Sequence, residues 1–392
     1  MKDTSDTGHI SPRDNGYVKT TEKTDNKKFF VMQFQITGKC NLRCSHCYNE
    51  DEDEPHFDMP LDQCILVLDK FLTTMKKWGR TPYIWISGGE PTISPHFWDV
   101  LAYLDDYVED YLTPIYAAVL SNGSTTNKTL AKNLEENRAI KYVQISVDGI
   151  SAETHDRIRG RGRFEEAIRA IRTLTPTSLE VHMHFVVHKG NYEDAFHIFA
   201  LAEELNVDVL TVTRLVPWGR GKEMLNTMLT SRETRILYRK LSDDLDSMAR
   251  ESAPAIPKPL ITRSRCDWPV IYQDPADKSF QTKNGVSCGI GGNIGKNIIN
   301  VMEDGSVYPC RRLPITIGNV LTEDIQDIWN HPLLWKFRGK SKHVKGKCQT
   351  CYFNRKAPHL CSGGASCISY GYYGDPFMPD PQCSVVPEEI KP

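Results

Sequence analysis

The sequence predicts an α/β protein in which a partial (β/α)6 barrel of the TIM type is followed by a small cysteine-rich domain. Strand-like and helical segments alternate from residue 29 to residue 216. There are six such strands, fewer than the eight that close a TIM barrel, so we expect an open-sided barrel. Eight of the twelve cysteines follow residue 265, where apolar periodicity is weak.

The predicted strands are short apolar runs, and all but the last are followed by apolar residues at helical spacing. Buried strands that alternate with helices form a parallel sheet with the helices outside. We expect strands at 29–37, 83–87, 116–121, 141–148, 179–187 and 207–216, and helices at 61–73, 96–108, 126–136, 164–174 and 192–204.

The chain divides into four segments by composition. Residues 1–27 are polar without apolar periodicity, which predicts a mobile tail. The barrel is expected over 28–225, and a helical linker over 226–285, with a helix at 231–250 and then a proline-rich connector. The cysteine-rich domain is expected over 286–392. It contains one predicted hairpin, which turns at Asp304-Gly305.

Overall charge and hydropathy exclude several classes of protein. A net charge of −2 provides no general basic field for nucleic acid. No apolar run approaches the ~18 residues of a membrane span. The first residues lack the layout of a signal peptide, so we expect a cytoplasmic protein. Because cytoplasmic thiols stay reduced, metal or cluster ligation explains the cysteines better than disulfides.

The first cysteine group lies directly after the first predicted strand. Cys40, Cys44 and Cys47 have CxxxCxxC spacing, at the carboxyl end of a parallel sheet, where barrels of this type hold their active sites. Three thiolates on one loop can bind three irons of a cubane cluster and leave the fourth iron open. The alternative is a zinc site completed by His46, or three buried thiols.

With its neighbouring motifs, this region resembles the radical S-adenosylmethionine (SAM) superfamily over most of residues 29–220. After the second strand, 87–91 read SGGEP, which looks like the family's GGEP motif. The resemblance implies that Cys40, Cys44 and Cys47 are the catalytic centre and hold a [4Fe–4S] cluster. It also implies that the open iron chelates the amino and carboxylate groups of SAM.

Further residues at the strand ends are expected to bind SAM by the same resemblance. Arg159 is the choice for the SAM carboxylate, with Arg157 and Arg161 as alternatives, because a guanidinium suits a carboxylate. Asn122-Gly123 and Asp148-Gly149 are also ordinary turn pairs, so turn chemistry is the competing explanation there. The expected SAM-binding residues are Tyr48, Gly88, Gly89, Glu90, Ser121, Asn122, Ser146 and Arg159.

The C-terminal cysteines resemble the SPASM extension of radical SAM enzymes, which usually carries two auxiliary [4Fe–4S] clusters. Their spacing around Cys361 is longer than the family's usual pattern. The resemblance assigns a distal cluster to Cys348, Cys351, Cys361 and Cys383, and a proximal cluster to Cys288, Cys310 and Cys367. The fourth proximal ligand is Cys266 or an open site. Structural zinc is the rival for these cysteines, and Cys64 is expected in a helix core.

The resemblance implies that one electron cleaves SAM and that the resulting 5′-deoxyadenosyl radical takes hydrogen from a substrate. A ribosomally made peptide is the leading substrate, crosslinked or otherwise oxidised, and a tetrapyrrole side chain of the haem pathway is the alternative. A non-enzymatic zinc- or cluster-binding module is the third possibility. A flavodoxin or ferredoxin would donate electrons, and a separate protein could bind the leader of a peptide substrate.

Two further segments are expected near the substrate. The stretch 214–221 follows the last strand and resembles the family's last barrel loop, which borders the substrate. Arg311 and Arg312 follow a predicted proximal-cluster cysteine and either bind an acidic group or form a solvated surface pair.

Overall fold

The fold is described from a computed structural model of the 392-residue chain. The structure describes residues 29–49, 56–111, 114–251, 260–262, 294–356, 358 and 361–385. The predicted tail and the two cysteines Cys266 and Cys288 lie outside these residues. No helix in the described ranges is both long and apolar enough to cross a membrane.

A ten-stranded sheet organises the molecule, in the order β10-β9-β8-β1-β2-β3-β4-β5-β6-β7. Its first six strands in sequence lie side by side in chain order, and each pair is parallel. This confirms the predicted partial (β/α)6 barrel. The six strands are β1 (Phe29–Thr37), β2 (Thr81–Gly88), β3 (Tyr116–Ser121), β4 (Ile140–Ser146), β5 (Glu180–Val187) and β6 (Val209–Arg214).

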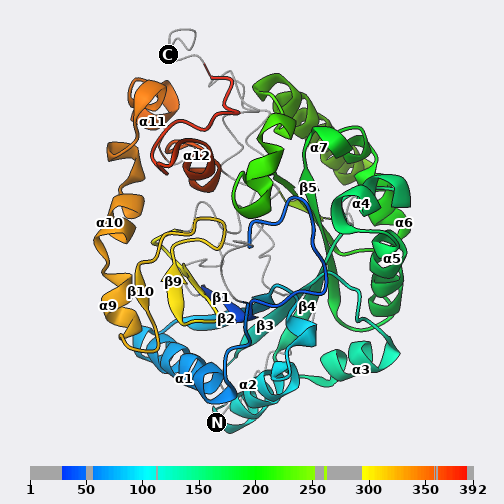
Figure 1. Cartoon of the computed structure of the whole chain (residues 1–392), viewed down its shortest axis with the longest axis vertical. Coiled ribbons are helices and arrows are strands. Elements are labelled where there is room, and N and C mark those ends of the chain that lie inside the picture. Colours follow the sequence, from blue (N-terminus) through cyan, green and yellow to red (C-terminus); the bar gives the residue numbers. More distant parts are fainter. Residues whose placement is uncertain are drawn as a thin grey trace, which may run out of the picture.

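The barrel helices form an outer arc around the curved sheet (Figure 1). Alternate strand residues such as Phe34 and Ile86 are fully buried with helix residues such as Leu68 in one core, because successive strand side chains point to opposite faces. The helices are α1 (Leu61–Trp78), α2 (Phe97–Tyr111), α3 (Lys128–Glu136), α4 (Ala152–Arg159), α5 (Arg163–Leu174) and α6 (Ile198–Glu204).

One helix prediction was wrong in part, and one helix was not predicted. The helix expected over 192–204 is α-helical only from Ile198, and short 3₁₀ turns precede it. At the first of these turns, the ring of His188 accepts a hydrogen bond from the Gly190 N–H at 3.0 Å, which favours a local turn over a longer helix. Helix α4 was missed because it is short and polar, with few apolar residues to reveal a period.

The sheet extends on both sides beyond the six predicted strands. β7 (Leu260–Thr262) pairs in parallel with β6, although the sequence placed these residues in a proline-rich connector after α7 (Ser231–Glu251). On the other side, β8 (Ile298–Val301) pairs in parallel with β1. The strands of the C-terminal region therefore continue the barrel sheet.

The predicted hairpin in the C-terminal region is confirmed. β8 and β9 (Ser306–Tyr308) pair antiparallel, and Gly305 adopts a φ of +80° in the turn between them. β10 (Gly318–Asn319) adds the sheet edge. Short helices follow along one side of the barrel (Figure 1): α9 (Ile325–Trp329), α10 (Pro332–Arg338), α11 (Tyr352–Lys356) and α12 (Ser366–Tyr373).

A buried ion pair joins the last barrel strand to the C-terminal region. Arg214, at the end of β6, forms two hydrogen bonds to the carboxylate of Asp380 at 3.0 and 2.8 Å. Both side chains are 1% exposed. Arg214 also donates to the side chain of Gln382 at 2.9 Å. Arg214 therefore anchors the two regions together, and its guanidinium is turned toward Asp380.

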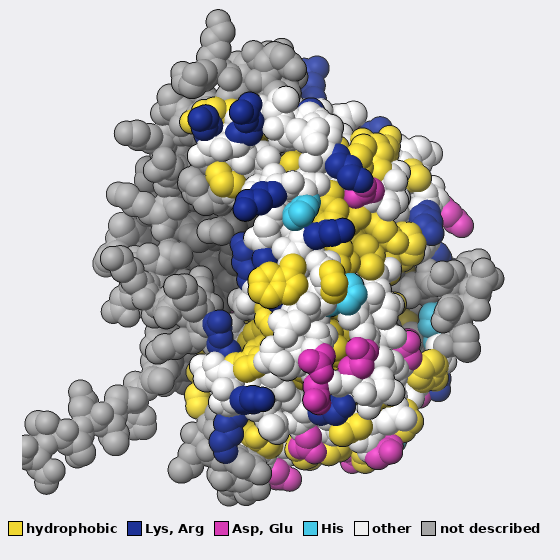
Figure 2. Space-filling model, turned by 90° about the vertical axis from the view of Figure 1, so that its left-hand side faces the viewer, with side chains coloured by type: hydrophobic (Ala, Val, Ile, Leu, Met, Phe, Trp, Pro, Cys, Tyr) yellow, Lys and Arg dark blue, Asp and Glu magenta, His cyan; other side chains and the backbone are white. Residues whose placement is uncertain are grey.

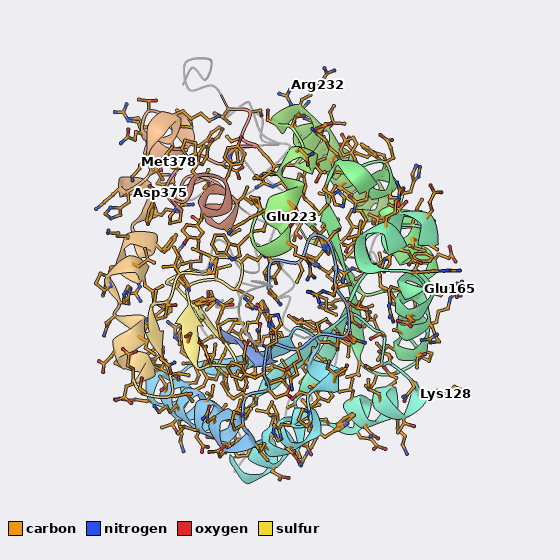
Figure 3. All side chains as sticks on the ribbon, in the orientation of Figure 1. Lys128, Glu165, Glu223, Arg232, Asp375 and Met378 are labelled. Atoms are coloured by element: carbon orange, nitrogen blue, oxygen red, sulfur yellow. The ribbon has the colours of Figure 1, made fainter. Side chains whose placement is uncertain are left out.

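This ion pair leads to a prediction about stability. We expect Asp380→Ala to lower the free energy of unfolding by about 3–5 kcal/mol, because it leaves the Arg214 guanidinium buried without its carboxylate. Denaturant unfolding of the cluster-loaded protein under anaerobic conditions measures the change. The matched control is Asp375→Ala, in the same segment (Figure 3), which removes a more exposed ion pair to Lys345 and should cost about 0–1 kcal/mol. Equal losses in the two variants would contradict the prediction.

Candidate active site

The CxxxCxxC loop leaves the carboxyl end of β1 and is held at several points. Cys44 is buried, Cys47 is half-buried and Cys40 is exposed. The Ser45 N–H donates to the carbonyl of Ile158 in α4 at 2.9 Å. Further along, the Cys47 N–H donates to the Cys44 carbonyl at 3.2 Å. The backbone conformation of the loop is therefore defined by its own turn and by α4.

The thiols of this loop have the chemistry of cluster ligands. Desolvation by the surrounding protein raises the pKa of Cys40 to about 11, although this residue reaches the surface, and burial raises the pKa of Cys44. A bound metal would therefore have to displace their protons. The side-chain amide of Asn122 lies 3.9 Å from the Cys40 sulfur, and the Arg159 guanidinium lies 3.8 Å from the Cys44 sulfur. Such N–H donors stabilise thiolates and tune a cluster bound to them.

Among the described residues, no group of three His, Cys, Asp or Glu side chains is placed to hold one metal ion. A cubane cluster offers a separate iron to each thiolate, so its three ligands need not converge on one point. The three cysteines, with N–H donors beside two of the sulfurs, therefore fit a cluster of this type.

The two glycines at the end of β2, Gly88 and Gly89, allow close contact with the start of the cysteine loop. The Gly89 N–H donates to the Thr37 carbonyl at 2.9 Å, and the Glu90 N–H donates to the Lys39 carbonyl at 2.9 Å. A Cβ on Gly89 would lie 2.3 Å from the Lys39 carbonyl oxygen, and one on Gly88 would lie 2.6 Å from that of Thr37. Packing between these backbones is thus sufficient to explain both glycines.

The Glu90 carboxylate is fully buried and bonded to other strand ends. Its oxygens accept hydrogen bonds from the Ser121 hydroxyl at 2.8 Å, the Asn122 N–H at 2.6 Å and the Thr92 hydroxyl at 2.6 Å. Burial raises its pKa, while these donors favour the ionised form. Glu90 and Ser121 thus join the ends of β2 and β3, and their predicted contacts with SAM remain predictions.

Asp148 is the centre of a second buried network. One carboxylate oxygen accepts from Arg159 at 2.6 Å and lies 2.8 Å from the His46 ring. The other oxygen accepts from the Val186 N–H at 2.8 Å. Although burial alone would raise its pKa, Arg159 and His46 hold the pKa of Asp148 well below its usual value. Asp148 thus orients the arginine that contacts Cys44.

The three candidate arginines differ in position. Arg159 ends α4 beside the cysteine loop, whereas the side chain of Arg157 is 66% exposed and pairs with Glu153. Arg161 is exposed in the following turn. Ser146 is partly buried at the end of β4, in register with His184 of β5. Of the three, Arg159 alone is shown in contact with the cysteine loop.

Sequence reasoning did not identify His46 and Asp148 as a connected pair. His46 was considered only as a possible zinc ligand, and Asp148 only as a turn residue. His46 lies between two of the cysteines, and Asp148 lies just beyond the end of β4, so each is marked as close to the site. Their contact could not be inferred, because they lie 102 positions apart in the sequence.

Tyr48 lies beside a polar group contributed by β1 and the C-terminal region. The guanidinium of Arg311 is 5.7 Å from the centre of the Tyr48 ring and donates to the side chain of Gln35. Gln35 in turn donates to the Glu303 carboxylate at 2.5 Å. Arg311 is only 4% exposed, so the interpretation as a solvated pair with Arg312 is wrong for this residue. Burial raises the pKa of Glu303, and Arg311 opposes that shift.

Four C-terminal cysteines come together as the distal assignment requires. Cys351, Cys361 and Cys383 pack around Phe353, and the charges of all three would raise the pKa of Cys348. Burial raises the pKa of Cys348 and of Cys383 to about 12.

The remaining cysteines occupy other places. Cys310 is buried after β9, and Cys367 lies in α12. Cys266 and Cys288 lie outside the described residues, so their assignments remain predictions. Cys64 is fully buried in α1, as expected.

Family models and known proteins identify the two regions of the chain. The radical SAM superfamily model matches residues 34–213, and the SPASM model, described as an iron–sulfur cluster-binding domain, matches residues 288–352. The Fe-coproporphyrin III synthase of Methanosarcina barkeri is 27% identical over 92% of this chain and 89% of its own length. The mycofactocin maturase MftC of Mycolicibacterium smegmatis is 27% identical over 90% and 82%, respectively.

Solved structures share the fold. The anSMEcpe structure with bound AdoMet (SAM) has a TM-score of 0.69 at 20% identity and covers 90% of this chain and 93% of that one. Streptococcus suis SuiB bound to the precursor peptide SuiA has a TM-score of 0.66 at 16% identity, with coverage of 91% and 76%. By the two family models, the chain contains a radical SAM superfamily domain over residues 34–213 and a SPASM iron–sulfur domain over residues 288–352, and it is an enzyme that binds SAM and a [4Fe–4S] cluster.

Proposed function

We propose that this enzyme abstracts hydrogen from a ribosomally synthesised peptide and thereby crosslinks or otherwise oxidises it. The observation that carries the proposal is the CxxxCxxC loop at the carboxyl end of β1, with Asn122 and Arg159 beside its sulfurs. When bound there, the cluster supplies the electron that cleaves SAM to methionine and a 5′-deoxyadenosyl radical.

The residues of the chain would divide the work around this cluster. Cys40, Cys44 and Cys47 hold it, and Asp148 keeps the Arg159 guanidinium against the Cys44 side, where it can also meet the SAM carboxylate. The Glu90 network fixes the ends of β2 and β3, where SAM would lie. This preorganisation keeps the reacting groups aligned.

A peptide substrate is supported by the names of related proteins and by one feature of the site. MftC is named a maturase, and the SuiB structure holds a precursor peptide. Arg311 brings a buried cation next to Tyr48, where it could bind a peptide carboxylate. A separate leader-binding protein would present the peptide, and a flavodoxin or ferredoxin would supply electrons.

Tetrapyrrole side-chain chemistry is the second candidate. Relatives named Fe-coproporphyrin III synthase and AdoMet-dependent heme synthase match about nine-tenths of the chain. Arg311 could bind a propionate as well as a peptide carboxylate. Arg311 would suit either substrate and therefore does not separate the two candidates. We place the tetrapyrrole second because a solved structure of this fold holds a precursor peptide.

We further propose two auxiliary clusters in the C-terminal region. The grouping of Cys348, Cys351, Cys361 and Cys383 supports a distal cluster. Cys288, Cys310 and Cys367, with Cys266 or an open site, would hold a proximal one. These clusters would accept one electron from the substrate radical that hydrogen abstraction leaves, which gives the oxidised product.

The substrate proposal can be tested directly. The reconstituted enzyme is given SAM and dithionite with either a leader-bearing precursor peptide or iron-coproporphyrin III. We expect 5′-deoxyadenosine above the substrate-free background, and a mass change, only with the peptide. Turnover of the porphyrin alone would reverse the two candidates, and metal analysis that finds only zinc, with no SAM cleavage, would reject both.

Removing one ligand of the first cluster should abolish SAM cleavage. In Cys44→Ala, the cluster loses a thiolate, so we expect loss of 5′-deoxyadenosine formation and of the iron associated with this loop, measured by chromatography and metal analysis. Cys64→Ala is the matched control, since it removes a buried cysteine from α1, and should retain both. SAM cleavage by Cys44→Ala would refute the role of this residue.

A distal ligand should behave differently. We expect Cys348→Ala to retain part of SAM cleavage but to form no modified product, because the barrel site is intact while electron removal fails. Parallel assays of 5′-deoxyadenosine and of product mass make the distinction, again against Cys64→Ala. Product formation at the wild-type level would show that Cys348 is not needed for turnover.

A further inference from the structure

The segment that carries most of the proposed distal site has an unusual charge. Between Asp327 and Asp375 the chain contains no acidic residue but eight lysines and arginines. Three of the four distal cysteines lie in this stretch. The whole protein has a net charge of −2, so the positive charge is concentrated locally.

Most of these basic side chains are exposed on one side of the molecule. We define the basic face as the exposed residues Lys336, Lys342, Lys345, Lys347, Arg355 and Lys356. They belong to α10, α11 and the turns between them, on the side that Figure 2 presents. In that view Lys and Arg side chains outnumber the acidic ones in the upper part, and most of the acidic side chains lie lower down.

Little of this charge is neutralised within the described part of the chain. Lys345 is the one member of the basic face with a described carboxylate partner, Asp375 at 2.5 Å. Lys347 donates to the Cys383 carbonyl at 2.7 Å, which leaves its charge uncompensated. Nearby, Trp335 is 58% exposed and the Arg338 guanidinium stacks 4.3 Å from its ring centre. An exposed aromatic ring with an arginine stacked on it is typical of a protein interface, and the surrounding lysines would attract an acidic partner over a longer range.

The basic face also lies close to the distal cysteines. Lys347 directly precedes Cys348. Arg355 and Lys356 lie at the end of α11, the helix that begins directly after Cys351. Cys351 is only half-buried, and the residues Gln349 and Thr350 before it are exposed. A partner bound to this face would therefore lie next to the distal site, without entering the barrel.

We propose that the basic face docks an acidic one-electron carrier protein, of the ferredoxin or flavodoxin class, that exchanges electrons with the distal cluster. This inference rests on the proposed function of the C-terminal cysteines. In each exchange one electron moves between the two partners, so that one of them, the carrier or the distal cluster, is oxidised and the other is reduced. Opposite charges would speed the encounter and make it dependent on salt, and a small interface lets the carrier leave after transfer.

The test uses anaerobic cluster-loaded enzyme and a reduced acidic [2Fe–2S] ferredoxin. The variant Lys342→Glu/Lys356→Glu reverses two charges of the basic face. We expect its second-order rate of ferredoxin oxidation, followed by stopped-flow absorbance at low salt, to fall about tenfold or more. The dissociation constant for ferredoxin, measured by calorimetry, should rise, and both quantities should depend less on salt than in the wild type.

The matched control is Lys128→Glu/Arg169→Glu, which makes the same change in net charge on α3 and α5. Lys128 points outward on the opposite side of the barrel (Figure 3). Equal effects of the two double variants, or no effect of either, would overturn the proposal. It would also be overturned if the basic-face variant lost binding of an acidic peptide or of RNA while ferredoxin oxidation stayed at the wild-type rate.

Dithionite-driven SAM cleavage separates this inference from the proposed function, because dithionite needs no docking protein. We expect the basic-face variant to cleave SAM with dithionite at the wild-type rate. If wild-type enzyme fails to cleave SAM, the proposed function itself fails. Cleavage by both proteins with unchanged ferredoxin kinetics would reject the docking surface alone.

Discussion

The buried carboxylate of Asp148 is the interaction on which the proposed active site most depends. It accepts from Arg159 in α4, lies against His46 in the cysteine loop, and accepts from the Val186 backbone in β5. A fully buried charge is stable only when such partners surround it. The same contacts that stabilise Asp148 therefore fix the cysteine loop relative to α4 and β5, and they direct the Arg159 guanidinium toward the Cys44 sulfur.

Glu90 performs a similar task on the other side of the loop. Its backbone N–H is bonded to Lys39, just before the first cysteine, and its carboxylate is bonded to the end of β3. Residues that a sequence motif associates with SAM are here also the residues that hold three strand ends together. Two buried carboxylates thus tie together the strand ends at the carboxyl edge of the sheet, and such contacts favour a fixed arrangement of the groups around the site.

The C-terminal region is joined to the barrel by both backbone and side-chain contacts. β8 continues the sheet beside β1, and Asp380 pairs with Arg214 at the far end of the barrel. Asp380 also accepts from the N–H of Gln382, next to Cys383. The described loops that carry auxiliary cysteines are therefore attached to the barrel at two places, beside β1 and at the end of β6. This leaves the segment with the basic face on the outside, between these two attachments.

The sequence by itself determined the alternation of strands and helices, the cysteine loop after β1, and the hairpin that turns at Asp304-Gly305. These features are local, because they depend on periodicity and on spacing within one segment. The tertiary structure decided which polar and charged side chains meet: Asp148 with His46 and Arg159, Arg311 with Gln35, and Arg214 with Asp380, 166 positions away. It also added β7 and the polar helix α4, which apolar periodicity did not reveal. Such pairings depend on how distant elements fold against one another, and a buried charge accepts any well-placed partner, so nothing in the local sequence names that partner.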